Sequence, residues 1–293
     1  MRGYLTHAFN SGGTNYLRMA YCLALSIKRT QSAVNRLSVV VPAGQPLPDA
    51  YREAFDHVIT VSDERPPHVD PAWRVDTFTR FYDLTPYAQT VTLDADMLFF
   101  DDVSSWWDDL AARDIVGGTA VTFRGEPIQD NPLRTDLYAA GLPDLHNGFL
   151  YFRAGAKAET LFAAMQRNQQ DWVQAATRHF GRPDVPFSSD CAFLIALRDT
   201  GLEDEAVSVV PGCPRFVHMK ACLQGWPHVP PTAREWRDYV DHSFDDELRL
   251  TIGGVRITDP FHYHVRDFVT DDLLAAYESA AYDARPRRRT ATW

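Results

Sequence analysis

Short strand-like runs alternate with helical segments along the N-terminal third of the chain, and this alternation limits the possible folds more than any other feature. β-branched and aromatic runs predict strands, while apolar residues at a 3.6-residue period predict helices. Strands are expected at 3–9, 36–42 and 57–61 and from residue 89 onward, and helices from Thr14 onward, at 49–56 and at 75–84. This spacing favours a mainly parallel sheet covered by helices on both faces.

The pattern is more mixed in the rest of the chain. Strands are expected at 114–121, 146–154, 206–211 and 215–221, with a late strand or turn at 261–268, and helices at 156–180, 190–200 and 271–281. No linker-like composition divides the sequence. We therefore expect an α/β protein with a single domain at 1–282, an elaborated C-terminal half and a flexible basic tail at 283–293.

Composition excludes several classes of protein. The 293 residues are 45% hydrophobic, which suffices for a substantial core and argues against disorder. The net charge of -10 disfavours a polyanionic partner, although it is compatible with a local basic groove. No apolar stretch approaches the ~20 residues of a membrane span, and the N-terminus lacks the apolar core of a signal peptide. We expect a cytoplasmic protein whose four cysteines are reduced, structural thiols.

Two acids interrupt the apolar run VTLDADMLFF at residues 91–100. Side chains two apart in an extended segment share a face, so Asp94 and Asp96 are expected to point the same way at the end of a strand. Two bare carboxylates this close repel each other, and a divalent cation relieves the repulsion. Ligands of open α/β sheets collect at the carboxyl ends of strands, and oxygen ligands favour Mg²⁺ or Mn²⁺. The run predicts a metal site; the simpler alternative is that Asp94 ends the strand and Asp96 is solvated in a turn.

The longer run TPYAQTVTLDADMLFF resembles the Asp-x-Asp segment of GT-A-fold glycosyltransferases, particularly those of glycosyltransferase family 8. Other stretches fit the same order along the chain. GYLTHAFNSGGTNYLRMAYCLALSIKRT resembles the first strand, nucleotide loop and first helix of that fold, and HNGFLYFRA resembles a strand near the donor sugar. SSDCAFLIAL resembles a helix start that carries an acid, and FHYHVRDF a C-terminal segment that supplies a histidine to the metal.

The resemblance implies a GT-A (Rossmann-like) fold and a metal-dependent transferase that uses a nucleotide-sugar, expected to be a UDP-sugar. Asp94 and Asp96 match the motif carboxylates, and His262 matches the family's metal-binding histidine. These three would hold Mn²⁺ or Mg²⁺, with Asp94 sharing the metal or holding the donor's ribose. His264 lies two residues further on and is an alternative to His262 as the ligand. Family 8 leans towards retention of configuration at the transferred sugar.

The same resemblance assigns residues to the sugar and the diphosphate. Asn147 and Gly148 match the strand that approaches the donor sugar, and Asp190 matches the acid that faces the sugar or the acceptor. The chain also departs from the family. Cys191 stands where the family has a glutamine, and the glycine and lysine after the metal-binding histidine are missing. Arg266 lies near that lysine's place and would hold a diphosphate oxygen.

Further candidates for donor and acceptor binding come from other loops and strands. Asn10 begins the loop NSGGT at 10–14, which precedes a helix N-terminus and suits a phosphate or nucleotide, although a plain turn explains it equally well. Arg74 and Arg80 lead into the motif strand and are candidates for the donor phosphates, against the commoner role of a solvated helix face. His218, in a later strand, is a candidate for the acceptor side.

Three alternatives to transfer onto a glycan or small-molecule hydroxyl are considered. In the first alternative the fold is the same and the acceptor is a modified base in phage-type DNA. The basic tail is the one direct support for this alternative. A nucleotidyltransferase also uses a parallel sheet and an acid pair but usually shows a Gly-rich phosphate loop with basic residues, which this N-terminus lacks. A catalytically silent nucleotide-sugar-binding protein would bind the donor without hydrolysing it.

Overall fold

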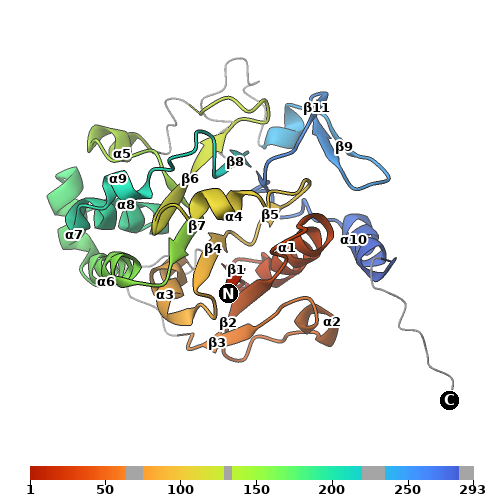
Figure 1. The fold of residues 1–293 in the computed structure, drawn as a ribbon, viewed down its shortest axis with the longest axis horizontal. Coiled ribbons are helices and arrows are strands. Elements are labelled where there is room, and N and C mark those ends of the chain that lie inside the picture. Colours follow the sequence, from red (N-terminus) through yellow and green to blue (C-terminus); the bar gives the residue numbers. More distant parts are fainter. Residues whose placement is uncertain (64–74, 129–133, 220–234, 284–293) are drawn as a thin grey trace.

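The computed structural model of the protein describes residues 1–63, 75–128, 134–219 and 235–283. Within these residues a nine-stranded sheet has the order β3-β2-β1-β4-β7-β6-β8-β12-β5 (Figure 1). Its first part is wholly parallel and consists of β1 (Arg2–His7), β2 (Leu37–Pro42), β3 (Val58–Val61) and β4 (Gln89–Leu93). Helical segments connect these strands, namely α1 (Tyr16–Thr30), α2 (Asp49–Arg52), the 3-10 helix η1 (Val75–Arg80) and α3 (Phe81–Leu84). The expected alternation is confirmed.

The second part of the sheet mixes strand directions. The strand β7 (His146–Arg153) runs antiparallel to β4 and to β6 (Ile115–Val121), whereas β8 (Arg215–His218) is parallel to β6 and to β12 (Phe261–His262). The short β5 (Met97–Leu98) pairs antiparallel with β12 and closes the order. Because five of the eight neighbouring pairs are parallel, the mainly parallel sheet is confirmed.

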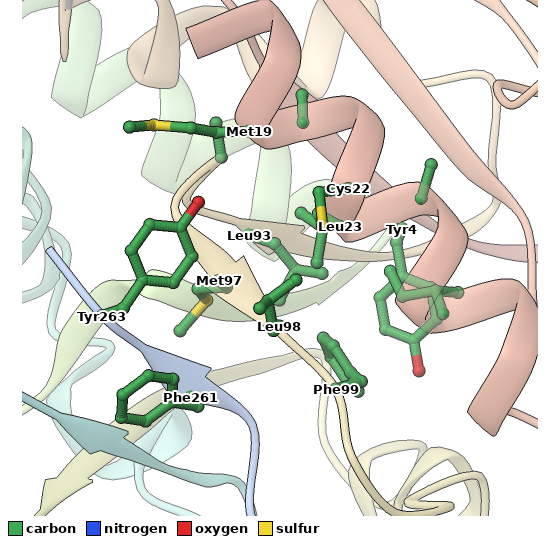
Figure 2. Close-up of a cluster of buried hydrophobic side chains, with 14 of the residues drawn as sticks. Tyr4, Met19, Cys22, Leu23, Leu93, Met97, Leu98, Phe99, Phe261 and Tyr263 are labelled. Carbon is green, nitrogen blue, oxygen red and sulfur yellow. The ribbon is translucent and has the colours of Figure 1, made fainter. Parts of the chain in front are cut away.

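Hydrophobic layers cover both faces of the sheet, since side chains alternate along each strand. Tyr4 packs on the face covered by α1 and α10 (Asp271–Asp283), and the next residue, Leu5, packs on the opposite face. That opposite face is covered by α6 (Ala156–Gln170), α7 (Trp172–Phe180) and α8 (Ser189–Thr200) (Figure 1). Figure 2 shows the α1 side, where Leu93 and Leu98 lie on either side of the two acids in the sequence and are both fully buried. These apolar neighbours anchor the motif.

The remaining elements add further buried side chains to these hydrophobic layers, among them Trp107 and Trp236. They are α4 (Trp106–Leu110), α5 (Thr135–Ala139), α9 (Glu203–Ala206), the 3-10 helix η4 (Trp236–Asp238) and a three-stranded antiparallel sheet of β9 (His242–Phe244), β10 (Leu250–Ile252) and β11 (Val255–Arg256). None of these elements is expected from the sequence. Most are short, so that neither the helical nor the strand period repeats often enough to be recognised.

Two predicted helices differ from the structure in their bounds, and one predicted strand is absent. The helix expected from Thr14 begins at Tyr16, and its N-cap is Asn15, whose side chain accepts from the Arg18 backbone N–H at 3.0 Å. The long helix expected at 156–180 is broken at Asp171 into α6 and α7. The strand expected at 206–211 is absent, because the chain there ends α9 and turns, which leaves two valines of the run half-exposed.

Two further predictions concern the cysteines and the membrane. Cys22, Cys191 and Cys213 are free thiols, as expected, and Cys222 lies outside the described residues. Among the helices of the described segments, none combines the length and apolarity needed to cross a membrane.

Candidate functional site

The two acids of the motif lie in a turn at the carboxyl end of β4. The strand ends at Leu93, the chain turns through Asp94–Asp96, and β5 begins at Met97. The prediction that the pleat of an extended strand aligns the two carboxylates is therefore wrong. A turn aligns them instead, because β5 must reverse to pair antiparallel with β12.

The pairing of β5 with β12 brings His262 to the two acids. Its register sets His262 opposite Met97, one residue after Asp96. The His262 Nε2 atom lies 3.0 Å from an Asp96 carboxylate oxygen and 3.8 Å from Asp94 Oδ2. One ligand atom from each of the three residues falls within 4.8 Å of the others. Three residues expected to meet at a metal are thus brought together across more than half of the chain.

Asp94 is held against β7 at a glycine. Its backbone N–H donates to the Gly148 carbonyl at 3.2 Å, and a Cβ atom on residue 148 would lie 2.3 Å from Asp94 Oδ2. The strand β7 is irregular here, since its register with β6 shifts between Gly117 and Gly118. Bulges of this kind commonly re-aim backbone near functional sites. We find that Gly148 makes room for the Asp94 carboxylate.

Electrostatics favour the ionised form of Asp96. Burial raises the pKa of this carboxyl, but the charge of His262 and its hydrogen bond lower it by more, so that the pKa falls below its usual range. Tyr16, the first residue of α1, faces the same acids: burial raises the pKa of its hydroxyl, and the charge of Asp96 raises it further, while Arg266 opposes the rise. The acids, Tyr16 and Arg266 therefore share one electrostatic environment.

The donor set fits a divalent cation. Two carboxylates and one imidazole nitrogen offer oxygen and nitrogen ligands, a set that suits Mn²⁺ and, with the remaining positions filled by water or phosphate oxygens, Mg²⁺. The glycine at 148 leaves the space that the Asp94 carboxylate needs. The positive charge of a cation would also relieve the repulsion between Asp94 and Asp96.

Asp190 and Asn147 meet beside this centre. Asp190 lies in the first turn of α8, and its Oδ1 accepts the backbone N–H of Asn147 at 2.9 Å. Since Asn147 directly precedes Gly148, the two acids Asp94 and Asp190 contact neighbouring residues of β7. The Asn147 side-chain Nδ2 is buried and has no hydrogen-bond partner among the described residues. A buried donor without a partner costs about 1–3 kcal/mol, and a bound ligand removes that cost.

Three imidazoles line the same edge of the sheet. The sequence assigned His262 to the metal and named His218 as a candidate for the acceptor side, whereas His146 was missed. The ring of His218 on β8 lies 4.8 Å from that of His262, and His146 on β7 lies 5.3 Å from His218. Their positions in the sequence could have identified them, because each histidine stands at an end of a strand that meets this edge. Arg134, which contacts His146, carried no recognisable signal, because it lies in a segment expected to be loop.

The other residues predicted to bind the donor differ in how close they lie to the metal cluster. The Asn10 side-chain oxygen accepts from the Leu17 backbone N–H at 3.0 Å and so satisfies a donor in the first turn of α1. Arg266 donates to the Gly12 carbonyl at 3.2 Å, which brings it to the loop at 10–14. Arg80 is exposed at the end of η1, and its binding of phosphate stays a prediction. Arg74 lies outside the described residues.

Asp101 and Asp102 directly follow the apolar run at 91–100 and lie outside the cluster of Asp94, Asp96 and His262. Asp101 forms an ion pair with Arg256 at 2.7 Å, and Asp102 accepts the backbone N–H of Ser104 at 2.9 Å. Their roles are structural, as the position of the pair after the apolar run indicates.

Comparisons with known proteins identify the fold. No family model and no curated protein matches the sequence. Among solved structures, the galactosyltransferase LgtC in complex with donor and acceptor sugar analogs matches with a TM-score of 0.50 at 13% identity, over 97% of this chain and 96% of that one. Mouse xyloside xylosyltransferase 1 matches with a TM-score of 0.48 at 12% identity, over 77% of this chain and 91% of that one. GlyE of Streptococcus pneumoniae matches with a TM-score of 0.41 at 11% identity, over 71% of this chain and 45% of that one. The chain has the GT-A glycosyltransferase fold.

Proposed function

We propose that the protein is a metal-dependent glycosyltransferase that moves a sugar from a nucleotide-sugar, a UDP-sugar in the first instance, to a hydroxyl acceptor. The observation that carries the proposal is the convergence of Asp94, Asp96 and His262 at the carboxyl edge of a GT-A sheet. The donor set suits Mn²⁺ or Mg²⁺, either of which supplies positive charge at a leaving diphosphate. The expected location is the cytoplasm.

The chain's own residues would bind and orient the donor around the metal ligands. Arg266 would hold a diphosphate oxygen; its hydrogen bond to the loop at 10–14 and its shared electrostatic environment with the acids support this role. Asn147 offers a buried amide N–H to a sugar hydroxyl. Asp190, fixed to the Asn147 backbone, would face the sugar or the acceptor.

The reaction breaks the bond between the anomeric carbon and the diphosphate oxygen and forms a bond from that carbon to the acceptor oxygen. The acceptor's proton leaves, and we assign it to no residue. The resemblance to family 8 favours retention of configuration. A modified DNA base is a less favoured acceptor, because the net charge of -10 disfavours a polyanionic partner.

A donor-hydrolysis and transfer screen tests the proposal. We expect turnover of a UDP- or GDP-sugar with Mn²⁺ and little without it. The double variant Asp94→Asn/Asp96→Asn should lose Mn²⁺ binding in calorimetry together with turnover, because it removes both carboxylate ligands. Asp101→Asn is the matched control, since its pair with Arg256 is exposed and lies outside the cluster. Unchanged Mn²⁺ affinity in the double variant would refute the metal site, and donor binding without turnover would favour a silent binding protein.

A further inference from the structure

Arg134, immediately before α5, is a buried cation next to Asp190. Its side chain is 5% exposed, whereas that of Asp190 is 33% exposed, and Arg134 Nη1 lies 3.6 Å from Asp190 Oδ2. Burying a guanidinium costs several kcal/mol unless opposite charges and hydrogen-bond acceptors surround it. The burial of Arg134 is therefore not explained by the packing of a short helix alone.

The guanidinium joins two elements of the site. Its Nη2 donates to the Leu145 carbonyl at 2.6 Å, its Nη1 lies 3.0 Å from His146 Nδ1, and its Nε lies 3.0 Å from an Asp144 carboxylate oxygen. Burial, and then the charge of Arg134, lower the pKa of His146 to about 3, so that the ring is neutral and can accept an N–H. One guanidinium thus links Asp144 and Leu145, which lead into β7, and His146, its first residue, to Asp190 of α8.

The two oxygens of Asp190 face different partners. Its Oδ1 accepts the Asn147 backbone N–H at 2.9 Å, and its Oδ2 faces Arg134. We infer that Arg134 is a positioning residue that fixes the Asp190 carboxylate beside Asn147 at the edge of the metal cluster. This inference rests on the proposed function, in which Asp190 faces the donor sugar or the acceptor. Arg134 itself is enclosed and acts through Asp190.

The planar fork explains why arginine suits this place. Its N–H groups point in fixed directions, so that it hydrogen-bonds the Leu145 carbonyl and a His146 ring nitrogen. Its charge lies at the same time within ion-pair distance of Asp144 and Asp190, whereas a lysine ammonium is a single compact charge. Loss of the fork frees the Asp190 carboxylate to rotate and leaves Asp144 without its partner in this cluster. Positioning residues around a reacting group typically contribute about 10–100-fold to activity.

Activity measurements on Arg134→Gln, Arg134→Lys and Arg198→Gln test the inference. We expect Arg134→Gln to lower kcat about 10–100-fold with a smaller change in the KM for the donor, and Arg134→Lys to restore part of kcat because it keeps the charge. Arg198 is the matched control: it ties the other end of α5 to α8 through the carbonyls of Ala140 and Gly141, at 2.8 and 2.6 Å. Arg198→Gln should keep kcat even where it lowers the midpoint of thermal unfolding.

A double-variant cycle with Asp190→Asn separates positioning from a structural role. If Arg134 acts through Asp190, Arg134→Gln should lower kcat little further when Asp190→Asn is already present. If the kcat losses of Arg134→Gln and Asp190→Asn multiply in the double variant, and all variants unfold at similar temperatures, the inference is overturned. Equal kcat losses in Arg134→Gln and Arg198→Gln would overturn it as well. These outcomes require an active wild-type protein. A wild-type chain that turns over no nucleotide-sugar would instead overturn the proposed function, and the inference with it.

Discussion

At the scale of single residues, the candidate site depends on a glycine as much as on its charged groups. Gly148 has no side chain, and the Asp94 carboxylate occupies the space where a Cβ would lie. The resemblance to known transferases assigned Gly148 to the approach of the donor sugar, and the structure adds a contact with the metal-binding acid. A glycine is required here for space, since its φ is not in the left-handed region.

Gly148→Ala should therefore impair metal binding without a change in charge. A Cβ at 2.3 Å from Asp94 Oδ2 must displace the carboxylate, and we expect Mn²⁺ affinity in calorimetry to fall about 10-fold or more. Gly155→Ala is the control, because residue 155 has an extended backbone and no atom within 4 Å of its added Cβ. Equal Mn²⁺ affinities for the two variants would show that Asp94 does not depend on this space.

His146 makes the stability of the protein depend on pH. Its pKa is lowered from 6.5 to about 3, by burial first and by Arg134 second, so the folded state does not take up the proton that the unfolded state binds below pH 6.5. Stability should therefore decrease as the pH falls from about 6.5 towards 3. In that window the free energy of unfolding decreases by about 1.4 kcal/mol for each pH unit, and by about 2 kcal/mol between pH 7 and pH 5.

Urea unfolding of the wild type and of His146→Gln at pH 7 and pH 5 measures this contribution. Glutamine can still accept the Arg134 N–H but does not titrate. From pH 7 to pH 5 the free energy of unfolding of the variant should therefore decrease by about 2 kcal/mol less than that of the wild type. An identical loss in both proteins would mean that His146 does not remain neutral in the fold.

At the scale of elements, the sequence predicts helices and strands whose hydrophobic pattern repeats, and it does not predict very short strands or bulges. The strands β2 and β3 were recognised by their β-branched runs and β1 by the turn residues that end it, and α1 because its apolar face recurs over four turns. The bulge in β7 was not predictable, because it depends on the close approach of Gly118 to the Phe149 carbonyl across the sheet. The convergence of His262 on the acids depends on β5, a strand of two residues.

The pairing of β8 with β12 gives His262 an aromatic neighbour. His218 lies directly opposite His262 in that pairing, and the two rings are 4.8 Å apart at an angle of 33°. Residues that orient a metal ligand typically contribute about 10–100-fold to affinity. We expect His218→Ala to weaken Mn²⁺ binding about 10-fold and His218→Phe, which keeps a ring against His262, to weaken it less.

Calorimetry of both variants checks this, with His57→Ala as the control. His57 precedes β3 and is exposed, far along the sheet order from β12. Equal losses of Mn²⁺ affinity in His218→Ala and His218→Phe would assign the effect to the ring nitrogens, which only the imidazole carries. Unchanged affinity in both would mean that the ring contact does not orient His262.

At the scale of the whole molecule, the metal cluster joins segments that are distant in the sequence. Asp94 and Asp96 follow the parallel first part of the sheet, whereas His262 comes from the last strand of the chain. The acids at this site also add to a net charge of -10. A cation bound there would both reduce the local repulsion and hold β12 to the turn after β4, and its binding free energy would stabilise the folded state as a whole.

Mn²⁺ should therefore raise the midpoint of thermal unfolding of the wild type. At a concentration 100 times the Kd, binding to the folded state adds about 2.7 kcal/mol, which for a chain of this size corresponds to a shift of about 5 °C. Asp96→Asn should show little shift, since it removes the ligand nearest to His262. Scanning calorimetry with and without Mn²⁺ measures both. Equal shifts in the two proteins would place the stabilising ion elsewhere, and the absence of a shift in the wild type, with calorimetric Mn²⁺ binding intact, would show that the ion also binds the unfolded chain.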